Sequence, residues 1–138
     1  MQVYQSKYLT LEVIPEQKFM QVSWSPATAQ MTDEIFKAEL TRYAEVAEQY
    51  RPEKCLIDTS VFGMTIVPET QEWVQANIHS RSLKAGIKKF AYIVSQDIFA
   101  QLSIEQTMEE SGFVFTTQYF DNQQQAMDWL MAESEVRK

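Results

Sequence analysis

The side chains best suited to binding chemistry follow an apolar run near the middle of the chain. The run Lys-Cys-Leu-Ile at 54–57 leads directly into Asp58, Thr59 and Ser60, and a second apolar run further on ends at Ser95. Ligands of α/β sheets usually bind at the carboxyl ends of strands, because loops and helix N-termini meet there. We therefore expect these four polar residues at a binding site. The alternative is that Asp58 and Ser95 only accept hydrogen bonds from nearby backbone N–H groups.

The segment that follows is more hydrophobic than a surface loop usually is. Residues 61–67 read Val-Phe-Gly-Met-Thr-Ile-Val, with neither a helical nor a strand period, and Thr65 is the hydroxyl among them. Three arrangements are open for Phe62, Met64 and Ile66. They tuck onto the core, they form a partner or dimer contact, or they cover an apolar pocket.

Residues for nucleophilic or metal chemistry are scarce. His79 is the only histidine and Cys55 the only cysteine, which excludes an internal disulfide or a multi-cysteine metal site. Cys55 lies in an apolar run and is expected to be buried and unreactive. On a helix that starts at Pro68, His79 projects away from the apolar stripe of Trp73 and Val74, so we expect it on the solvated surface. We expect no catalytic residue, no cofactor, no metal and a non-enzymatic function.

Basic residues gather near the end of the same helix: Arg81, Lys84, Lys88 and Lys89. Cations at a helix C-terminus are favoured by the helix dipole and by solvation. The alternative is that this basic patch contacts an anion or a membrane surface. The chain as a whole carries a net charge of −7, so its average surface repels a phosphate backbone and nucleic acid is not an expected partner.

Length and composition indicate one folded domain over 1–138. The chain has 138 residues, of which 45% are hydrophobic and 22% charged, values close to the globular average. Residues 1–18 lack the continuous apolar core of a signal peptide, and no later run is long enough to span a bilayer. We therefore expect a cytoplasmic protein, with a polar tail at 133–138.

The periodicity of the apolar residues predicts five strands. Stretches 8–14 and 19–24 alternate apolar and polar residues and are separated by a short Pro-Glu-Gln-Lys link, which is typical of a hairpin. Stretches 54–58 and 90–94 are nearly all apolar, so we expect them at the centre of the sheet with both faces covered. Residues 113–120 alternate again and are expected at a lateral position.

Helical signals alternate with these strands. Four helices are expected: one capped by Thr32 and ending before Arg51, one from Pro68 to Gly86, one over 98–108 closed by Gly112, and one that follows a capping box of Asp121 and Gln124. The order ββαβαβαβα predicts an α/β fold with a mixed, mostly parallel five-stranded sheet and right-handed crossovers.

Several later segments carry a family resemblance. The sequences Ala-Tyr-Ile-Val-Ser at 91–95, Met-Glu-Glu-Ser-Gly at 108–112 and Tyr-Phe-Asp-Asn-Gln-Gln-Gln-Ala at 119–126 resemble the later strand, a helix end and the last strand-to-helix turn of STAS domains. These domains occur in bacterial anti-sigma-factor antagonists. The stretch 95–110 is similar to segments of small bacterial STAS-like proteins. The resemblance implies a STAS-like βα superhelix.

The chain departs from that family where the antagonists carry their phosphorylatable serine. The antagonists have Asp-Ser-Ser-Gly in this loop, whereas residues 61–68 here read Val-Phe-Gly-Met-Thr-Ile-Val-Pro. The hydroxyls of Thr59, Ser60 and Thr65 do not match that motif. We therefore expect the apolar side chains of this loop, rather than a phosphorylated hydroxyl, to make the functional contact.

Two functions follow as hypotheses. The leading one is a protein-interaction module of STAS-like type that uses the loop 58–68 as its contact. STAS-like domains are similar in structure to lipid-transfer domains of the CRAL-TRIO type. The alternative implied by this resemblance is a binder of an apolar or lipid-like small molecule, with the basic patch touching an anionic head group or a membrane.

Overall fold

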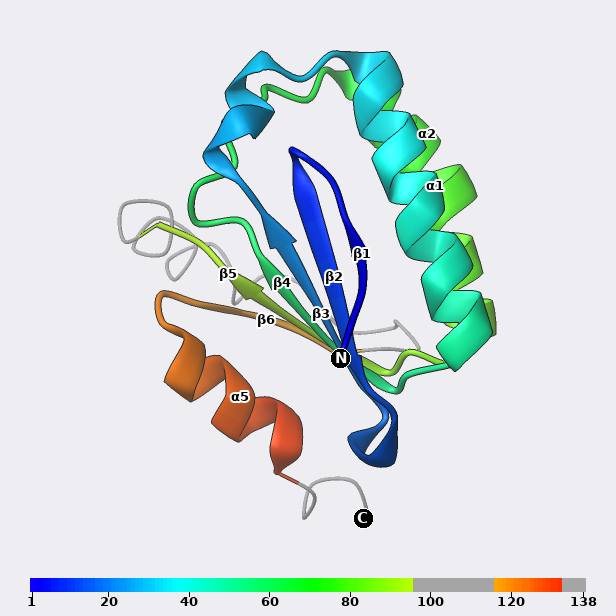
Figure 1. Cartoon of the computed structure of the whole chain (residues 1–138), viewed down its shortest axis with the longest axis vertical. Coiled ribbons are helices and arrows are strands. Elements are labelled where there is room, and N and C mark those ends of the chain that lie inside the picture. The colour runs from blue at the N-terminus through cyan, green and yellow to red at the C-terminus, as the bar shows by residue number, and fades with distance from the viewer. Residues whose placement is uncertain (96–115, 133–138) are drawn as a thin grey trace.

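A computed structural model describes residues 1–95 and 116–132 of the chain. These residues form an α/β structure around a six-stranded mixed sheet, with helices on both faces (Figure 1). The helix expected over 98–108 with its cap at Gly112, the beginning of the last strand at 113–115 and the polar tail at 133–138 lie outside the described residues.

The sheet has the order β1-β2-β3-β4-β5-β6. Its first three strands pair antiparallel, and β3 to β6 pair parallel. The strands are β1 (Gln2–Gln5), β2 (Leu9–Ile14), β3 (Phe19–Trp24), β4 (Lys54–Asp58), β5 (Lys89–Ile93) and β6 (Thr116–Phe120). The prediction of five strands is therefore wrong, because it omits β1, whose four residues are too few to show a period.

The strands expected at the centre need one revision. The order places β4 and β5 between two neighbours each, but it also places β3 in the interior, although its alternating pattern suggested a lateral strand. Alternation in β3 arises because Met20, Val22 and Trp24 are fully covered on one face, while Gln21 and Ser23 on the other face are half-exposed. An interior strand can alternate in this way when its second face is only partly covered.

Helix α1 (Asp33–Tyr50) begins and ends as its sequence predicts. The hydroxyl of Thr32 accepts a hydrogen bond from the backbone N–H of Ile35 at 3.2 Å, and Arg51 adopts a left-handed conformation that closes the helix. The buried carboxylate of Glu39 accepts hydrogen bonds from the hydroxyls of Tyr4 and Ser6, each at 2.7 Å. These contacts fasten the edge strand β1 to α1.

The second helical stretch comprises three consecutive segments. Helix α2 (Pro68–Val74) continues into a π-helical turn η3 (Gln75–His79) and then into α3 (Ser80–Ala85). Its start at Pro68 and its end at Gly86, which has a φ of 108°, confirm the predicted boundaries. The π-helical turn was not predicted. Such turns are rare and frequently occur at functional sites.

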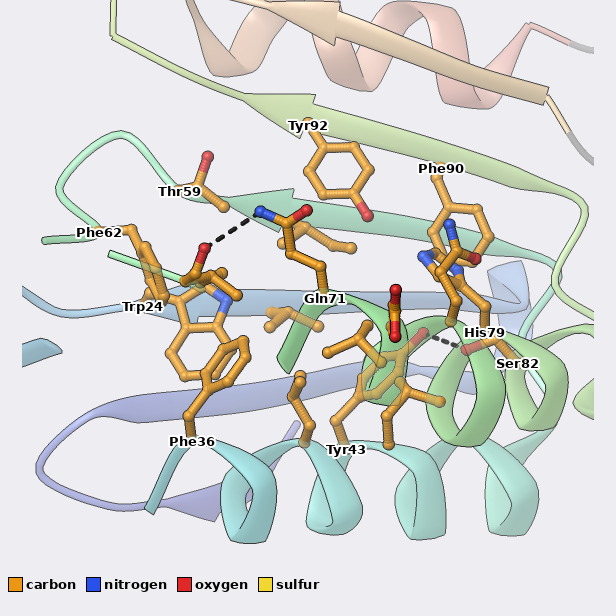
Figure 2. A pocket seen from close by; sticks show the side chains of 18 of the residues that line it. Trp24, Phe36, Tyr43, Thr59, Phe62, Gln71, His79, Ser82, Phe90 and Tyr92 are labelled. Atoms are coloured by element: carbon orange, nitrogen blue, oxygen red, sulfur yellow. Dashed lines mark hydrogen bonds between the residues drawn. The ribbon is translucent and has the colours of Figure 1, made fainter. Parts of the chain in front are cut away.

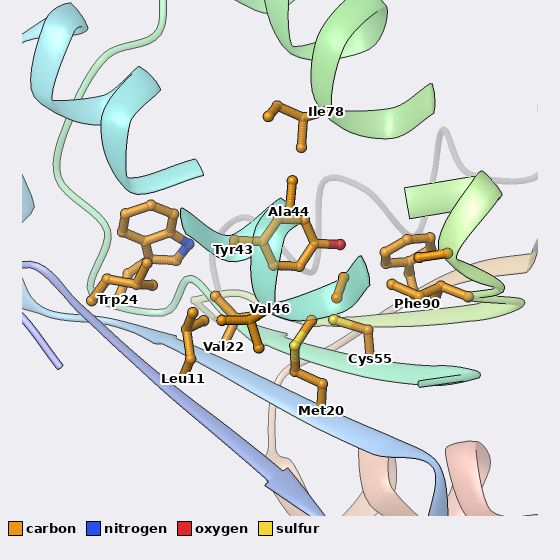
Figure 3. Packing of buried hydrophobic residues seen from close by; sticks show 14 of the residues in the cluster. Leu11, Met20, Val22, Trp24, Tyr43, Ala44, Val46, Cys55, Ile78 and Phe90 are labelled. Atoms are coloured by element: carbon orange, nitrogen blue, oxygen red, sulfur yellow. The ribbon is translucent and has the colours of Figure 1, made fainter. Parts of the chain in front are cut away.

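Two hydrophobic clusters cover the two faces of the sheet. Helices α1 and α2 lie side by side on one face, and α5 (Gln123–Met131) lies on the other (Figure 1). In the larger cluster, Tyr43 of α1 lies between Trp24 and Phe90 over the side chains of β3 and β4 (Figure 3). The N-cap of α5 is Asn122, which accepts from Gln125 N at 2.8 Å, one residue later than the predicted capping box.

Short 3-10 helices join the antiparallel strands to one another and to α1: η1 (Pro15–Gln17) and η2 (Pro26–Gln30). None of the helices over 1–95 and 116–132 is both long enough and apolar enough to cross a membrane.

Candidate functional site

A cavity of about 690 Å³ lies between the sheet and the helices α1, α2 and α3 (Figure 2). Its floor is a row of side chains from three adjacent strands, because Val22 is paired in register with Ile57, and Ile57 with Tyr92. The α1 residues Phe36 and Leu40 form part of its wall. The volume is in the range of pockets that hold small molecules and cofactors.

Aromatic rings close one end of the cavity. Phe62 from the loop after β4 packs edge-on against Trp24 at 5.2 Å between ring centroids, and it lies 5.9 Å from the ring of Phe36. The loop is tied down next to these rings, since the backbone N–H of Gly63 donates to the hydroxyl of the fully buried Thr28 at 2.8 Å. The aromatic wall therefore depends on the docking of the loop.

Residues 61–67 have a period that was not recognised in their sequence. Phe62, Met64 and Ile66 are half-buried and pack against the large cluster, while the residues between them are exposed. This alternation is that of an extended chain with one face on the protein. Phe62 and Ile66 line the cavity, whereas Met64 packs on the core without lining it, so the loop both covers the core and borders a pocket.

The lining of the cavity includes a few polar groups. The hydroxyls of Tyr43 and Ser82 are hydrogen-bonded at 2.8 Å, and the hydroxyl of Thr59 donates to the carbonyl of Ile93 at 2.8 Å. Burial raises the pKa of Tyr43 well above its ordinary value and also raises the pKa of Tyr92. Both phenols are therefore protonated at neutral pH.

The polar rim of the cavity comes from the helix. Gln71, Glu72 and Gln75 are exposed and also line the cavity, so they lie where it opens to solvent. The side-chain amide of Gln71 donates to the carbonyl of Ile66 at 3.1 Å (Figure 2). This bond links the helix to the loop and leaves the amide oxygen of Gln71 on the side of Tyr92.

His79 lies at the cavity rather than on the solvated surface, so its predicted position is wrong. It is half-buried, lines the cavity and lies 6.3 Å from the ring of Phe90 (Figure 2). The π-helical turn explains the error, because i→i+5 bonding adds residues to the turn and rotates the following side chains out of α-helical phase. Burial lowers the pKa of His79, which favours the neutral imidazole.

The predicted polar residues at the strand ends do not form one site. Thr59 lines the cavity, but Asp58 is on the opposite face of β4, where its carboxylate accepts from the backbone N–H of Ser60 at 3.0 Å and from its hydroxyl at 2.7 Å. Asp58 therefore makes the local turn that the alternative interpretation described. Thr65 is exposed on the outer side of the loop, and Ser95 is half-buried just after β5.

The predicted basic patch is divided between the two sides of the sheet. Arg81 of α3 makes two hydrogen bonds of 2.8 Å to the carboxylate of Glu48 in α1. Lys89 instead donates to the carbonyl of Trp129, at 3.1 Å, at the end of α5. Lys84 and Lys88 are exposed. Two of the four predicted cations are thus engaged within the fold, and on different faces.

The thiol of Cys55 is fully buried beneath α1, as its apolar run predicts. Burial raises its pKa to about 12, so the thiol stays protonated and shielded from reagents.

Several cavity residues were missing from the predicted site, among them Trp24, Tyr43, Gln71, Glu72, Gln75, His79 and Tyr92. A signal for some of them was present. In parallel strands, alternate residues share a face, so Ile57 and Thr59 of one strand and Phe90 and Tyr92 of the next could have been grouped together. Which of the two faces carries a cavity depends on how the helices pack.

Comparisons with protein-family models, with curated proteins and with solved structures found no match for this chain.

Proposed function

We propose that the protein binds a small, largely apolar molecule in the cavity between the sheet and the helices α1 to α3. The observation that carries this proposal is the cavity of about 690 Å³, lined mainly by aliphatic and aromatic side chains with a polar rim on one helix. Pockets of this size and composition are typical of small-molecule and cofactor sites.

The geometry favours a small ligand over a protein partner at the loop after β4. A partner surface built on Phe62 and Met64 requires both side chains to project into solvent. Both are half-buried against the core, and Phe62 together with Ile66 borders the cavity. The inward face of the loop is therefore better suited to enclosing a ligand than to docking a protein.

We propose binding rather than catalysis. The hydroxyls of Thr59 and Ser82 are engaged in hydrogen bonds of the fold, and the thiol of Cys55 is buried with its pKa raised to about 12. A nucleophile needs an adjacent base or a lowered pKa, and these groups have neither among their described contacts.

A STAS-like fold is part of the same proposal. Parallel pairing from β3 to β6, with α1 between β3 and β4 and the α2–α3 stretch between β4 and β5, supports it. The anionic head group or membrane contact suggested by the basic patch has weaker support, because Arg81 and Lys89 are held by other parts of the fold.

The proposal can be tested by filling the cavity. Ile57 is half-buried at its floor, so Ile57→Trp places a larger side chain in the empty volume. Ile14→Trp is the matched control, because Ile14 is also half-buried but packs in the cluster on the other face of the sheet. The neutral dye Nile red is titrated into each protein and its fluorescence is followed.

Wild type and Ile14→Trp should bind the dye saturably, and Ile57→Trp should lose at least about tenfold in affinity while urea unfolding shows that it remains folded. Absence of saturable binding to the wild type would contradict the proposal. So would a folded Ile57→Trp variant that binds like the wild type.

A protein contact is a second candidate, carried by the outer side of the same loop. Val61 is 48% exposed and Val67 is 39% exposed, which leaves two apolar side chains in solvent close to each other in sequence. Light scattering of the wild type and of the Val61→Asp/Val67→Asp variant tests for self-association. A particle size that is the same for both proteins would argue against a dimer contact here.

A further inference from the structure

The charge of the cavity comes from one acidic side chain. Among the described residues that line it, Glu72 alone carries a formal charge at neutral pH, and no lysine or arginine is present. His79 adds no positive charge there, because burial lowers its pKa and keeps the imidazole neutral. Among the side chains of 1–95 and 116–132 that line the cavity, an entering anion would therefore meet a carboxylate and no cation.

Two cations close to the helical stretch that carries the rim are directed elsewhere. The ammonium group of Lys37 lies 5.3 Å from the ring centre of Trp73, and Arg81 is paired with Glu48. None of these residues lines the cavity. The overall charge of −7 adds a weak long-range repulsion of anions.

Two groups of the rim, on Gln71 and Glu72, present hydrogen-bond acceptors to a ligand. The Gln71 amide donates its N–H to the carbonyl of Ile66, so its own carbonyl oxygen is the group left on the cavity side (Figure 2). The carboxylate of Glu72 adjoins it in sequence and also lines the cavity. Both groups accept hydrogen bonds, so they suit a ligand whose polar end donates them.

The walls are also suited to a positive charge. Six of the lining residues are aromatic, supplied by β3, α1, β5 and the loop after β4: Trp24, Phe36, Tyr43, Phe62, Phe90 and Tyr92. Aromatic faces attract ammonium groups through the ring quadrupole, and they do so while offering apolar contact to the rest of the ligand.

We propose that the cavity binds an amphipathic amine, an inference that rests on the proposed small-molecule function. Its ammonium group is placed at Glu72 and Gln71, and its apolar part extends toward the ring of Phe62. The cavity discriminates against carboxylates of the same shape, so fatty-acid-like anions are poor ligands.

Three compounds of matched shape test this selectivity: phenylbutylamine, phenylbutanol and phenylbutyrate. Each is used to displace Nile red from the wild-type protein at low salt. The amine should bind about tenfold more tightly than the carboxylate, because attraction and repulsion at one partly solvated carboxylate each contribute a few-fold. The alcohol should fall between them, and added salt should reduce the difference.

Glu72→Gln should lower the ratio of amine to carboxylate affinity to about threefold or less, and Glu72→Lys should invert it. Glu69→Gln is the matched control, because Glu69 is an exposed acid of the same helix that does not line the cavity. The control should keep the wild-type ratio.

Phenylbutyrate that binds as tightly as phenylbutylamine would overturn the inference, as would a ratio unchanged in Glu72→Gln. In either case, dye binding that is retained by the wild type and lost in Ile57→Trp would leave the proposed function standing. If Nile red and all three compounds fail to bind, the proposed function and this inference fail together.

Discussion

Replacing Thr28 by valine should release the loop that borders the cavity while leaving the shape of the core almost unchanged. Thr28 is fully buried in η2, and valine has nearly the same volume. The hydroxyl of Thr28 accepts from the N–H of Gly63 at 2.8 Å and donates to the carbonyl of Ser25 at 2.7 Å. Both hydrogen bonds are lost in the variant.

The expected loss of stability depends on which hydrogen bonds Ser25 and Gly63 can still make in the variant. The carbonyl of Ser25 still accepts from the backbone N–H of residue 28, and the exposed Gly63 can turn to water, so neither group is left buried and unsatisfied. At about 1 kcal/mol per hydrogen bond, Thr28→Val should lower the free energy of unfolding by about 1–2 kcal/mol. For a chain of this length that corresponds to about 3–7 °C in Tm.

Urea unfolding of the wild type and the variant measures this difference, with an unchanged m-value as evidence that the unfolded ensemble is the same. Nile red affinity should fall in parallel, because Phe62 loses its fixed position beside Trp24. Thr65→Val is the control, since Thr65 is exposed on the same loop. It should stay within about 0.5 kcal/mol of the wild type.

A Thr28→Val protein with wild-type stability and dye affinity would refute the reasoning, because the loop would then be held by its apolar contacts alone. An equal loss in Thr65→Val would refute it as well, since the effect would then not depend on the buried hydroxyl.

Three further outcomes are expected. Because the pKa of His79 is lowered in the folded protein, the unfolded chain takes up a proton there as pH falls below about 6.5, whereas the folded protein does not. The free energy of unfolding should therefore decrease as the pH falls below about 6.5. His79→Gln should remove this decrease in urea titrations across pH, and a slope that is unchanged would contradict the assignment. Gly63→Ala should destabilise the fold by about 1–3 kcal/mol, because the new methyl carbon would lie 2.8 Å from Cβ of Ala29. A variant that unfolds at the wild-type Tm would contradict this, since the neighbouring residues would then have moved at no cost. The thiol of Cys55 should resist alkylation at pH 8 until urea unfolds the chain, and rapid labelling of the native protein would show that the strand opens.

Much of the fold was predictable because its signals are local. The hydroxyl of Thr32 caps a helix three residues away, Pro68 starts a helix where its missing N–H costs nothing, and Gly86 ends one with a positive φ. Each signal works through contacts within a few residues. The hairpin of β2 and β3 has the same local character.

The candidate site was predicted only in part. Thr59, Phe62 and Ile66 were expected at a site and do line the cavity, whereas Asp58 and Ser60 bond to each other instead. The residue types show that polar groups gather at the end of this strand. Successive residues of a strand point to opposite faces of the sheet, however, so these polar groups do not all lie on the same side.

His79 and the basic residues show a second limit. One π-helical turn changes the direction in which His79 points, and the apolar period of the sequence contains no trace of it. Arg81 and Lys89 lie eight positions apart, yet one pairs with α1 and the other with α5. Proximity along the chain did not translate into a common surface.

The sequence by itself determined the ends of α1 and of the α2–α3 stretch, the α/β class and the burial of Cys55, since these depend on caps, turns and apolar runs that act over short distances. Only the tertiary structure decided that Val22, Ile57 and Tyr92 form one row, because strand register joins residues about 35 positions apart. The same holds for the cavity above that row. It exists because α1 and the α2–α3 stretch leave a gap over the row, and that gap depends on side-chain packing between segments far apart in the chain.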